Sequence, residues 1–204
     1  MIAWPDTPPG HASCSDAERA LSRLLEGNRR FAQSAAEHPD QSSGLRMSLS
    51  SGQHPFAVVL TCSDSRVAPE LVFDQGLGDL FVVRVAGNIV DDAVIGSIEF
   101  AAAHLLVPLV LVLGHQNCGA VQAALGEEPE AHIKTLAEAI RPAVAKARAL
   151  PGDLLDNAVR ENVRLVVEQL TASHPVLAER IEARKLMIVG GRYDLGTGEV
   201  ERIG

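Results

Sequence analysis

Three short stretches of apolar and β-branched residues constrain the fold of this chain most, because helical patterns separate them. They cover residues 56–61, 80–85 and 108–114. Their side chains are apolar throughout instead of alternating with polar ones, which indicates strands that are buried on both faces. Buried strands that alternate with helices are typical of a parallel sheet covered by helices. We therefore expect an α/β fold, with a last strand at 185–190 that leads into a hairpin at 193–198.

The chain is expected to form one α/β domain with an N-terminal arm. Residues 1–14 are rich in Pro and Gly and predict irregular structure, and a capping box predicts that a helix opens at Ser15. The polar stretch 34–54 is interpreted as a tether, which would let this helix pack away from the main body. The boundaries are thus 1–54 for the irregular segment and arm, and 55–204 for the α/β domain. Further helices are expected at 91–106, 118–125, 130–149, 153–172 and 175–184, with a short one that starts at Pro69.

Composition and charge exclude several classes of protein. A net charge of −8, without any basic cluster, argues against a nucleic-acid binder. The longest apolar runs, 56–60 and 105–113, are far shorter than the roughly 20 residues of a membrane-spanning helix. The first residues show no legible signal peptide, so the cytoplasm is the expected location. Three cysteines in a chain of 204 residues indicate reduced thiols that serve a metal or catalysis.

Two of those cysteines and a histidine follow predicted strands. Cys62 comes directly after 56–61, and His115 and Cys118 come after 108–114. Ligands of open α/β sheets bind outside the carboxyl ends of strands, so these three side chains converge if the strands are neighbours. Two thiolates and one imidazole suit Zn²⁺, and three protein ligands leave its fourth position open for catalysis. A lone Cys or His near a strand is more often a core residue, but the combination favours a metal site. We interpret Cys14 as incidental.

Asp64 and Arg66 flank this predicted site. They could be a surface ion pair that contributes less than about 1 kcal/mol. Alternatively, Asp64 could accept a hydrogen bond from a zinc-bound hydroxide, or it could become the fourth zinc ligand and close the site. A bidentate pair with Arg66 would favour the first of these two roles and oppose the second.

These residues and their flanks resemble the signature motifs of the β-class carbonic anhydrases. The two site motifs are CSDSRV at 62–67 and HQNCGAV at 115–121. The resemblance extends over most of the chain, including 24–31, 81–88, 96–100 and 193–198. It implies a parallel sheet of four strands in the order 2-1-3-4, an antiparallel fifth strand, and an N-terminal helical arm that reaches across a partner. It also implies a homodimer, which could assemble further into a homotetramer, with the active site at the dimer interface.

The activity that the resemblance implies is the reversible hydration of carbon dioxide to bicarbonate and a proton, by attack of a zinc-bound hydroxide. Cys62, His115 and Cys118 would hold the Zn²⁺, with Asp64 and Arg66 as the catalytic pair. Carbonyl sulfide and carbon disulfide hydrolases resemble the same family and use the same ligands, so the motifs do not separate these substrates. A non-catalytic zinc or redox sensor is a further alternative, in which the two cysteines oxidise or Asp64 closes the zinc permanently.

The resemblance also implies a substrate pocket. One subgroup carries a Gln nine residues before the first zinc cysteine, which is Gln53 here. The other residues implied to line the pocket are Phe81, Val85, Ala86, Phe100 and Gly119. Gln53 and the N–H of Gly119 would donate hydrogen bonds to the substrate oxygen that gains charge. Gln53 could instead be a solvated loop residue, and the two Phe residues could be core. Val59 stands where another subgroup has the Trp of an allosteric bicarbonate site, so we expect no such site.

Overall fold

The computed structural model describes residues 14–126 and 130–203. Within this part of the chain the strands are β1 (Ala57–Thr61), β2 (Leu80–Arg84), β3 (Leu109–His115), β4 (Met187–Tyr193) and β5 (Val200–Ile203). The helices are α1 (Cys14–Ala32), α2 (Ser43–Ser48), α3 (Pro69–Val72), α4 (Asp92–His104), α5 (Gly119–Leu125), α6 (Ile133–Ala147), α7 (Leu154–Thr171) and α8 (Val176–Glu182). There are also two 3₁₀ turns, η1 (Leu49–Ser51) and η2 (Ala86–Asn88).

The strands form one sheet in the order β2-β1-β3-β4-β5, in which only the β4–β5 pair is antiparallel. The predicted α/β fold, its strand order and its fifth strand are thereby confirmed. β1 and β3 lie at the centre and are buried along their whole length, as their unbroken apolar sequences require. Neighbouring parallel strands end at the same edge, so the segments that follow β1 and β3 meet there.

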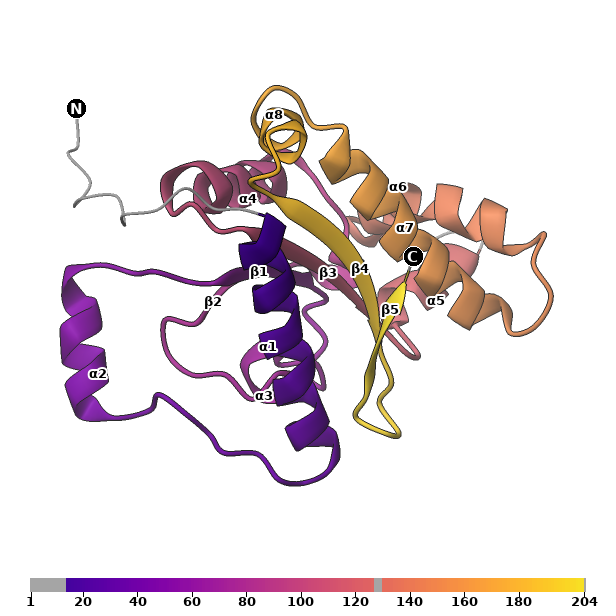
Figure 1. Ribbon diagram of the computed structural model, residues 1–204. Helices are drawn as coiled ribbons and strands as arrows, with labels where there is room; N and C mark the ends of the chain where they lie inside the picture. Colours follow the sequence, from indigo (N-terminus) through magenta and orange to yellow (C-terminus); the bar gives the residue numbers. More distant parts are fainter. Residues whose placement is uncertain (1–13, 127–129, 204) are drawn as a thin grey trace.

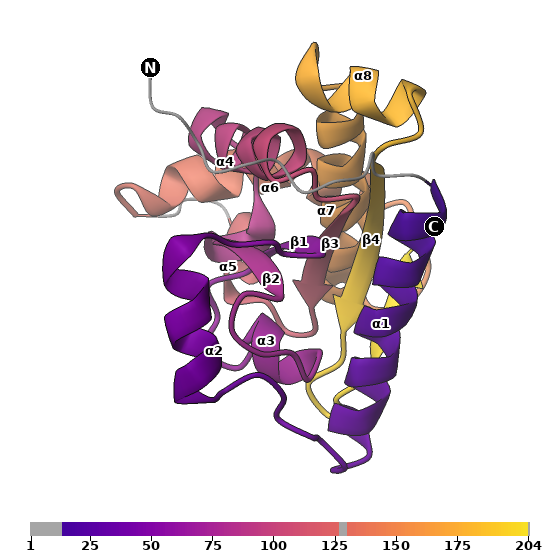
Figure 2. The ribbon, with the colours of Figure 1, turned by 60° about the vertical axis from the view of Figure 1, so that its left-hand side comes forward.

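Alternate residues of the central strands supply two different cores. Val58 and Leu60 of β1 pack with α4, α7 and α8, whereas Ala57 and Val59 pack with α1 and α3. Figure 1 shows α1 on one face of the sheet and α6 and α7 on the other, and Figure 2 shows α1 beside β4. A third cluster, formed by α5, α6 and α7, surrounds Cys62 and Cys118. The site predicted from sequence therefore rests on a packed layer of helices.

Three sequence-based expectations are wrong in detail. The N-terminal helix does not pack away from the body, because Leu24 of α1 is fully buried against the sheet. The polar stretch 34–54 contains α2, which buries none of its residues and stands at the β2 side of the molecule (Figures 1 and 2). β4 continues beyond residue 190 because Gly190 and Gly191 leave room for neighbouring side chains. A Cβ at Gly190 would lie 2.7 Å from Val163 Cγ1 of α7.

The other deviations are small. β2 is half-buried because it is the edge strand, although its sequence is as apolar as that of the central strands. The expectation of irregular structure for 1–14 falls outside the described residues, except that α1 already includes Cys14. None of the helices in the described ranges is long and apolar enough to cross a membrane.

Asp74 ties α1 and the loop after it to the turn that follows α3. Its buried carboxylate accepts hydrogen bonds from Arg30 Nε at 2.6 Å and from the backbone N–H groups of Glu37 and His38. Burial acts to raise the pKa of Asp74, but these donors outweigh it and hold the pKa below its usual range. The carboxylate therefore stabilises the fold in its charged form.

Asp74→Asn is expected to lower the free energy of unfolding by about 2 kcal/mol at pH 7, because a charged acceptor is lost. Since the folded-state pKa is depressed, this contribution is present in full above the unfolded-state pKa of about 4 and is lost progressively as the pH falls from there through the folded-state pKa. Urea titrations of both proteins at pH 7 and at about pH 3 test this. The exposed pair of Lys134 with Glu138 supplies the control, and Glu138→Gln should cost less than about 0.5 kcal/mol. A difference that does not change with pH would contradict the role of the Asp74 charge.

Candidate metal centre

Cys62, His115 and Cys118 meet at the carboxyl edge of the sheet. Cys62 follows β1, and His115 is the last residue of β3, which pairs with β1 up to Thr61. Cys118 stands at the N-cap position, directly before the first residue of α5. All three residues are buried, and their ligand atoms lie within 4.8 Å of one another. The predicted convergence is confirmed.

The donor set fits zinc. The two Sγ atoms are 3.9 Å apart, and a tetrahedral zinc with Zn–S bonds of about 2.3 Å would place two sulfurs about 3.8 Å apart. His115 Nδ1 lies 2.9 Å from the carbonyl oxygen of Gln116, so Nδ1 carries the proton and donates it there. Nε2 then keeps its lone pair, is buried, and has no hydrogen-bond partner among the described residues. A buried nitrogen of this kind, beside two sulfurs, is what a metal ligand requires.

The two cysteine side chains form a hydrogen-bonded pair. The hydrogen bond from Cys118 is the largest of the causes that together lower the pKa of Cys62 to about 4 against the opposing effect of burial, and the N–H of Gly87 acts in the same direction. The same hydrogen bond, together with burial, raises the pKa of Cys118, while the N–H groups of Val121 and Ala120 at the start of α5 act in the opposite direction. The pair therefore gives up its first proton more readily than a lone buried thiol does, which favours metal binding because the metal replaces thiol protons.

Asp64 and Arg66 form the bidentate pair that the sequence suggested. Arg66 Nε donates to Asp64 Oδ1 at 2.9 Å and Nη2 donates to Oδ2 at 2.7 Å. These hydrogen bonds hold the pKa of Asp64 well below its usual range. Asp64 Oδ2 lies 3.9 Å from His115 Nε2, so the carboxylate borders the ligand cluster. Arg66 also reaches the carbonyl oxygen of Asn117 at 3.3 Å and so bridges the two loops that carry the ligands.

Three residues around the centre were not singled out from the sequence. Arg84, at the end of β2, donates to the carbonyl oxygens of Cys62 and Asp64 at 3.1 and 2.8 Å. The backbone N–H of Gly87 donates to Cys62 Sγ at 3.2 Å. Asn162 Nδ2, from α7, donates to the carbonyl oxygen of Gly87 at 2.8 Å. The available signal for Asn162 was a polar residue within an apolar helix stripe.

The residues predicted to line the substrate pocket fall into two groups. Val85 and Ala86 directly follow β2 and lead to Gly87, beside Cys62. Gln53, by contrast, is exposed and precedes β1, whereas Cys62 follows that strand, whose five residues span about 13 Å. The structure therefore does not bring Gln53 to the ligand cluster of the same chain.

Phe81 and Phe100 lie together but away from the cluster. Their ring centroids are 6.3 Å apart. Phe81 pairs with Val58 near the start of β1, three residues before the end of β2, a distance of about 10 Å along the strand. Gly119 is the first residue of α5, and a Cβ there would meet nothing within 4 Å. The space into which a Gly119 side chain would point is therefore open.

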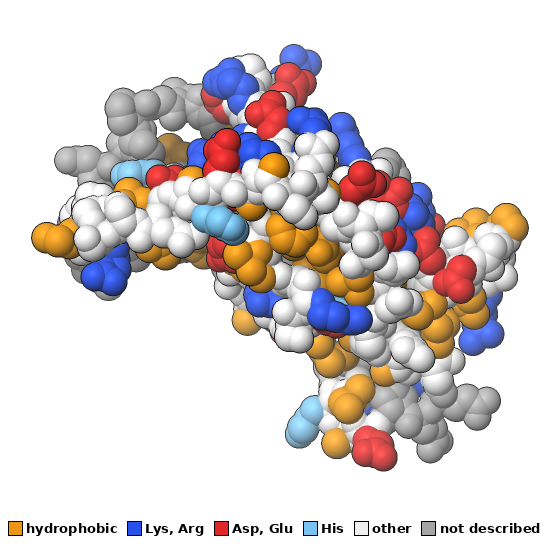
Figure 3. Space-filling model, turned by 90° about the horizontal axis from the view of Figure 1, so that it is seen from below, with side chains coloured by type: hydrophobic (Ala, Val, Ile, Leu, Met, Phe, Trp, Pro, Cys, Tyr) orange, Lys and Arg blue, Asp and Glu red, His pale blue; other side chains and the backbone are white. Residues whose placement is uncertain are grey.

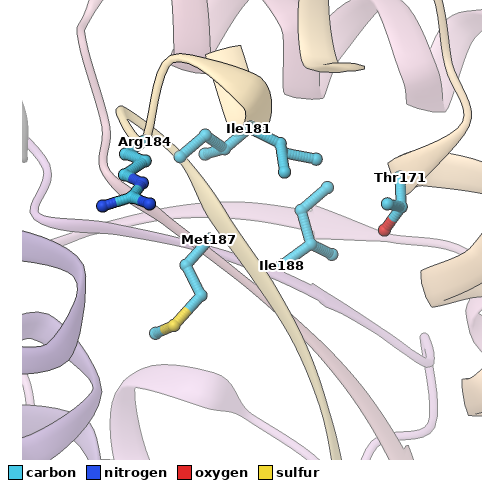
Figure 4. Close-up of a pocket in the computed structure, with 6 residues that line it drawn as sticks. Thr171, Ile181, Arg184, Met187 and Ile188 are labelled. Atoms are coloured by element: carbon cyan, nitrogen blue, oxygen red, sulfur yellow. The ribbon is translucent and has the colours of Figure 1, made fainter. Parts of the chain in front are cut away.

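A surface cavity of about 320 Å³ lies elsewhere. It forms where the end of α7, α8 and the start of β4 meet, and Figure 4 shows Ile181, Arg184 and Met187 around it. Met187 pairs with Leu109 at the start of β3, whereas His115 is at the end of β3. The cavity is thus at the opposite edge of the sheet and is not the metal centre.

A mostly parallel α/β sheet that presents two cysteines, one histidine and a paired carboxylate at its carboxyl edge defines a metalloprotein with a Cys₂His centre. The sequence model of the carbonic anhydrase family matches residues 57–200. The solved structure of a Coccomyxa β-carbonic anhydrase in complex with acetazolamide is similar with a TM-score of 0.73 and 31% identity, over 90% of this chain and 86% of that one. The chain belongs to the β class of the carbonic anhydrase family.

Sequence relatives agree with this assignment. Carbonic anhydrase 2 of Mycobacterium tuberculosis is 45% identical over 184 residues, which cover 88% of this chain and 89% of the relative. A carbonic anhydrase of Mycolicibacterium smegmatis is 42% identical over 192 residues, which cover 92% and 93%. A structure described as a tetrameric β-carbonic anhydrase, from Sordaria macrospora, is similar with a TM-score of 0.74 and 26% identity, over 91% of this chain and 98% of that one.

Proposed function

We propose that this chain catalyses the reversible hydration of carbon dioxide to bicarbonate and a proton. The observation that carries the proposal is the buried cluster of Cys62, His115 and Cys118, with the free Nε2 of His115 and the Asp64 carboxylate beside it. Zinc held by these three ligands would act as a Lewis acid that lets water lose a proton near neutral pH and so supplies the attacking hydroxide, a chemistry for which carbonic anhydrases are themselves the standard example.

Asp64 is proposed to orient the nucleophile. Arg66 holds both carboxylate oxygens, so Asp64 stays ionised and cannot turn freely toward the ligands. Its Oδ2 would accept the proton of the nucleophile in a hydrogen bond and so direct the oxygen lone pair at the substrate carbon. Val85, Ala86 and the open space at Gly119 would border the substrate on this side.

Stopped-flow measurement of carbon dioxide hydration, on protein with a measured zinc content, tests this function. We expect turnover of carbon dioxide to exceed turnover of carbonyl sulfide. A preference for carbonyl sulfide would assign the chain to the related hydrolases instead. No hydration between pH 7 and 9 with zinc bound would favour the sensor.

The working unit is proposed to be a homodimer in which each chain completes the site of the other. Gln53, Phe81 and Phe100 match pocket positions of the family, yet they lie at the opposite end of β1 and β2 from Cys62. A two-fold partner could bring them to the ligand cluster of the neighbouring chain. Large exposed side chains at Met47, Leu71 and Leu77 support an association of this kind, and Figure 3 shows hydrophobic side chains gathered on the face seen from below.

Mixing two damaged chains tests the shared site. Gln53→Ala is expected to lower kcat/KM about 100-fold, as loss of a donor to developing charge does, and Asp64→Asn is expected to act similarly. In a heterodimer of the two variants, one site is intact and the other carries both defects. Unfolding and refolding an equal mixture should therefore restore about a quarter of the wild-type activity, since about half of the dimers are mixed.

The matched control is each variant refolded alone, which should stay at its low activity. If the mixture shows no more than the average of the two variants, Gln53 does not act across an interface. Size-exclusion chromatography of the same samples reports whether they are dimers or larger assemblies, as for the tetrameric relative from Sordaria macrospora.

The finer assignments belong to the same proposal. We place the chain in the subgroup with an active-site Gln and without an allosteric bicarbonate site. Val59, where that other site would have its Trp, is fully buried. Two free thiols within 3.9 Å need a reducing compartment to remain metal ligands, which favours the cytoplasm.

A further inference from the structure

A line of hydrogen bonds connects α7 with a metal ligand. Asn162 Nδ2 donates to the carbonyl oxygen of Gly87 at 2.8 Å, and the N–H of Gly87 donates to Cys62 Sγ at 3.2 Å. The two bonds use the acceptor and the donor of one residue. The position of that residue therefore decides whether its N–H points at the sulfur.

Gly87 occupies a restricted place in the 3₁₀ turn η2. Its φ of +72° lies in the left-handed region, which favours glycine. A Cβ there would lie 2.7 Å from Ile140 Cδ1 and 3.0 Å from the Cβ of Ala120. The absence of a side chain lets the turn fit between α5 and α6, but it also leaves nothing on Gly87 itself to hold it. The carbonyl oxygen is the group through which the protein can fix this residue.

Asn162 is placed to hold the carbonyl oxygen of Gly87, and this hydrogen bond is its main polar contact. It is 1% exposed, and its neighbours along the buried stripe of α7 are apolar, namely Val159, Val163 and Val166. Its Oδ1 is buried without a hydrogen-bond partner among the described residues. Burying an amide costs free energy unless its hydrogen bonds are made, so an apolar residue would serve packing alone better. The bond to Gly87 is the interaction that distinguishes Asn162 from the valines around it.

We propose that Asn162 is a positioning residue of the metal centre, acting through Gly87 on the sulfur of Cys62. This inference rests on the zinc site of the proposed function. By holding Gly87 through its carbonyl oxygen, Asn162 keeps the N–H of the same residue directed at one lobe of the sulfur and leaves another for the metal. Outer hydrogen bonds of this kind orient ligands and tune the charge that they donate, and losing one typically lowers metal affinity about 10–100-fold.

Asn162→Leu removes the donor and keeps the number and branching of the side-chain heavy atoms, although two methyl groups take more space than an amide. Zinc release to an excess of chelator is expected to become about tenfold faster than in the wild-type protein. In cobalt-substituted protein, the sulfur-to-cobalt charge-transfer band is expected to shift, because the thiolate loses part of its hydrogen bonding. Both readouts are independent of catalytic activity. If leucine prevents folding, Asn162→Ala removes the same donor without adding volume and is measured in the same way.

Val166→Ala is the matched control for a destabilised helix. Val166 is buried one turn further along α7, and its side chain has no polar group that could reach Gly87. This variant should lower the thermal stability while zinc release and the cobalt band remain as in the wild-type protein. If folded Asn162→Leu releases zinc at the wild-type rate and its cobalt band is unchanged, Asn162 is not a positioning residue, while the metal centre itself still stands. Failure of the wild-type protein to bind zinc would instead overturn the metal centre and the proposed function with it.

Discussion

Cys62→Ser is expected to abolish stable zinc binding and to lower carbon dioxide hydration by about 1000-fold or more. The serine hydroxyl stays protonated near neutral pH, so it does not replace a thiolate as a ligand. The remaining pair, His115 and Cys118, offers only two ligands. Zinc content by elemental analysis and initial rates by stopped flow, both on freshly purified reduced protein, measure the two effects.

Cys14→Ser is the matched control, because this cysteine is expected to be incidental to the metal centre. It should bind zinc in the same amount as the wild-type protein and show the same rate. Retention of a full zinc complement by Cys62→Ser would contradict the assignment of the ligand cluster. The same result for Cys118→Ser would place the metal elsewhere in the molecule.

Asp64→Asn is expected to leave the zinc content unchanged while lowering kcat/KM for carbon dioxide about 100-fold. The substitution keeps the size of the side chain but replaces an anionic acceptor by a neutral amide, so the nucleophile loses its proton acceptor. Groups that hold or move a proton at the reacting atom typically contribute about 10²–10⁴-fold. Zinc analysis and hydration rates on one preparation separate this effect from loss of metal.

Asp91→Asn is the comparison for a carboxylate that serves structure only. Asp91 caps α4 by accepting a hydrogen bond from the N–H of Val94, and asparagine is an equally good cap. This variant should retain full activity. Undiminished hydration by Asp64→Asn would show that the carboxylate does not orient the nucleophile.

Much of the metal centre was predictable from the sequence because its ligand residues lie at or just after the ends of predicted strands. Cys62 follows β1 and His115 ends β3, two strands whose apolar sequences mark them as central, and parallel strands bring their carboxyl ends together. The pairing of Asp64 with Arg66 is equally local, since the partners are two positions apart along one loop. These features need only the order of the strands.

The remaining features depend on contacts between distant segments. Asn162 is 75 residues from Gly87 in sequence, and no periodicity reveals which neighbour a buried amide will meet. The packing of α1 follows from the fit of Leu24 against the sheet, which the polar tether after it does not reveal. Gln53 and Phe81 match pocket positions of the family in their sequence spacing. Sequence spacing does not show whether a side chain contributes to the site of its own subunit or to that of a partner.

The length of strand β1 sets the distance between two functional positions of the chain. The strand separates Gln53, which precedes it, from Cys62, which follows it, and its alternate residues belong to two different cores. Inserting one residue would exchange the two sets of side chains between the faces of the sheet. It would also change the spacing between Gln53, which is proposed to act in the site of the partner chain, and Cys62, which is a metal ligand in its own chain. Insertions should therefore be tolerated in the exposed segment around α2, whereas the length of β1 is fixed by both ends at once.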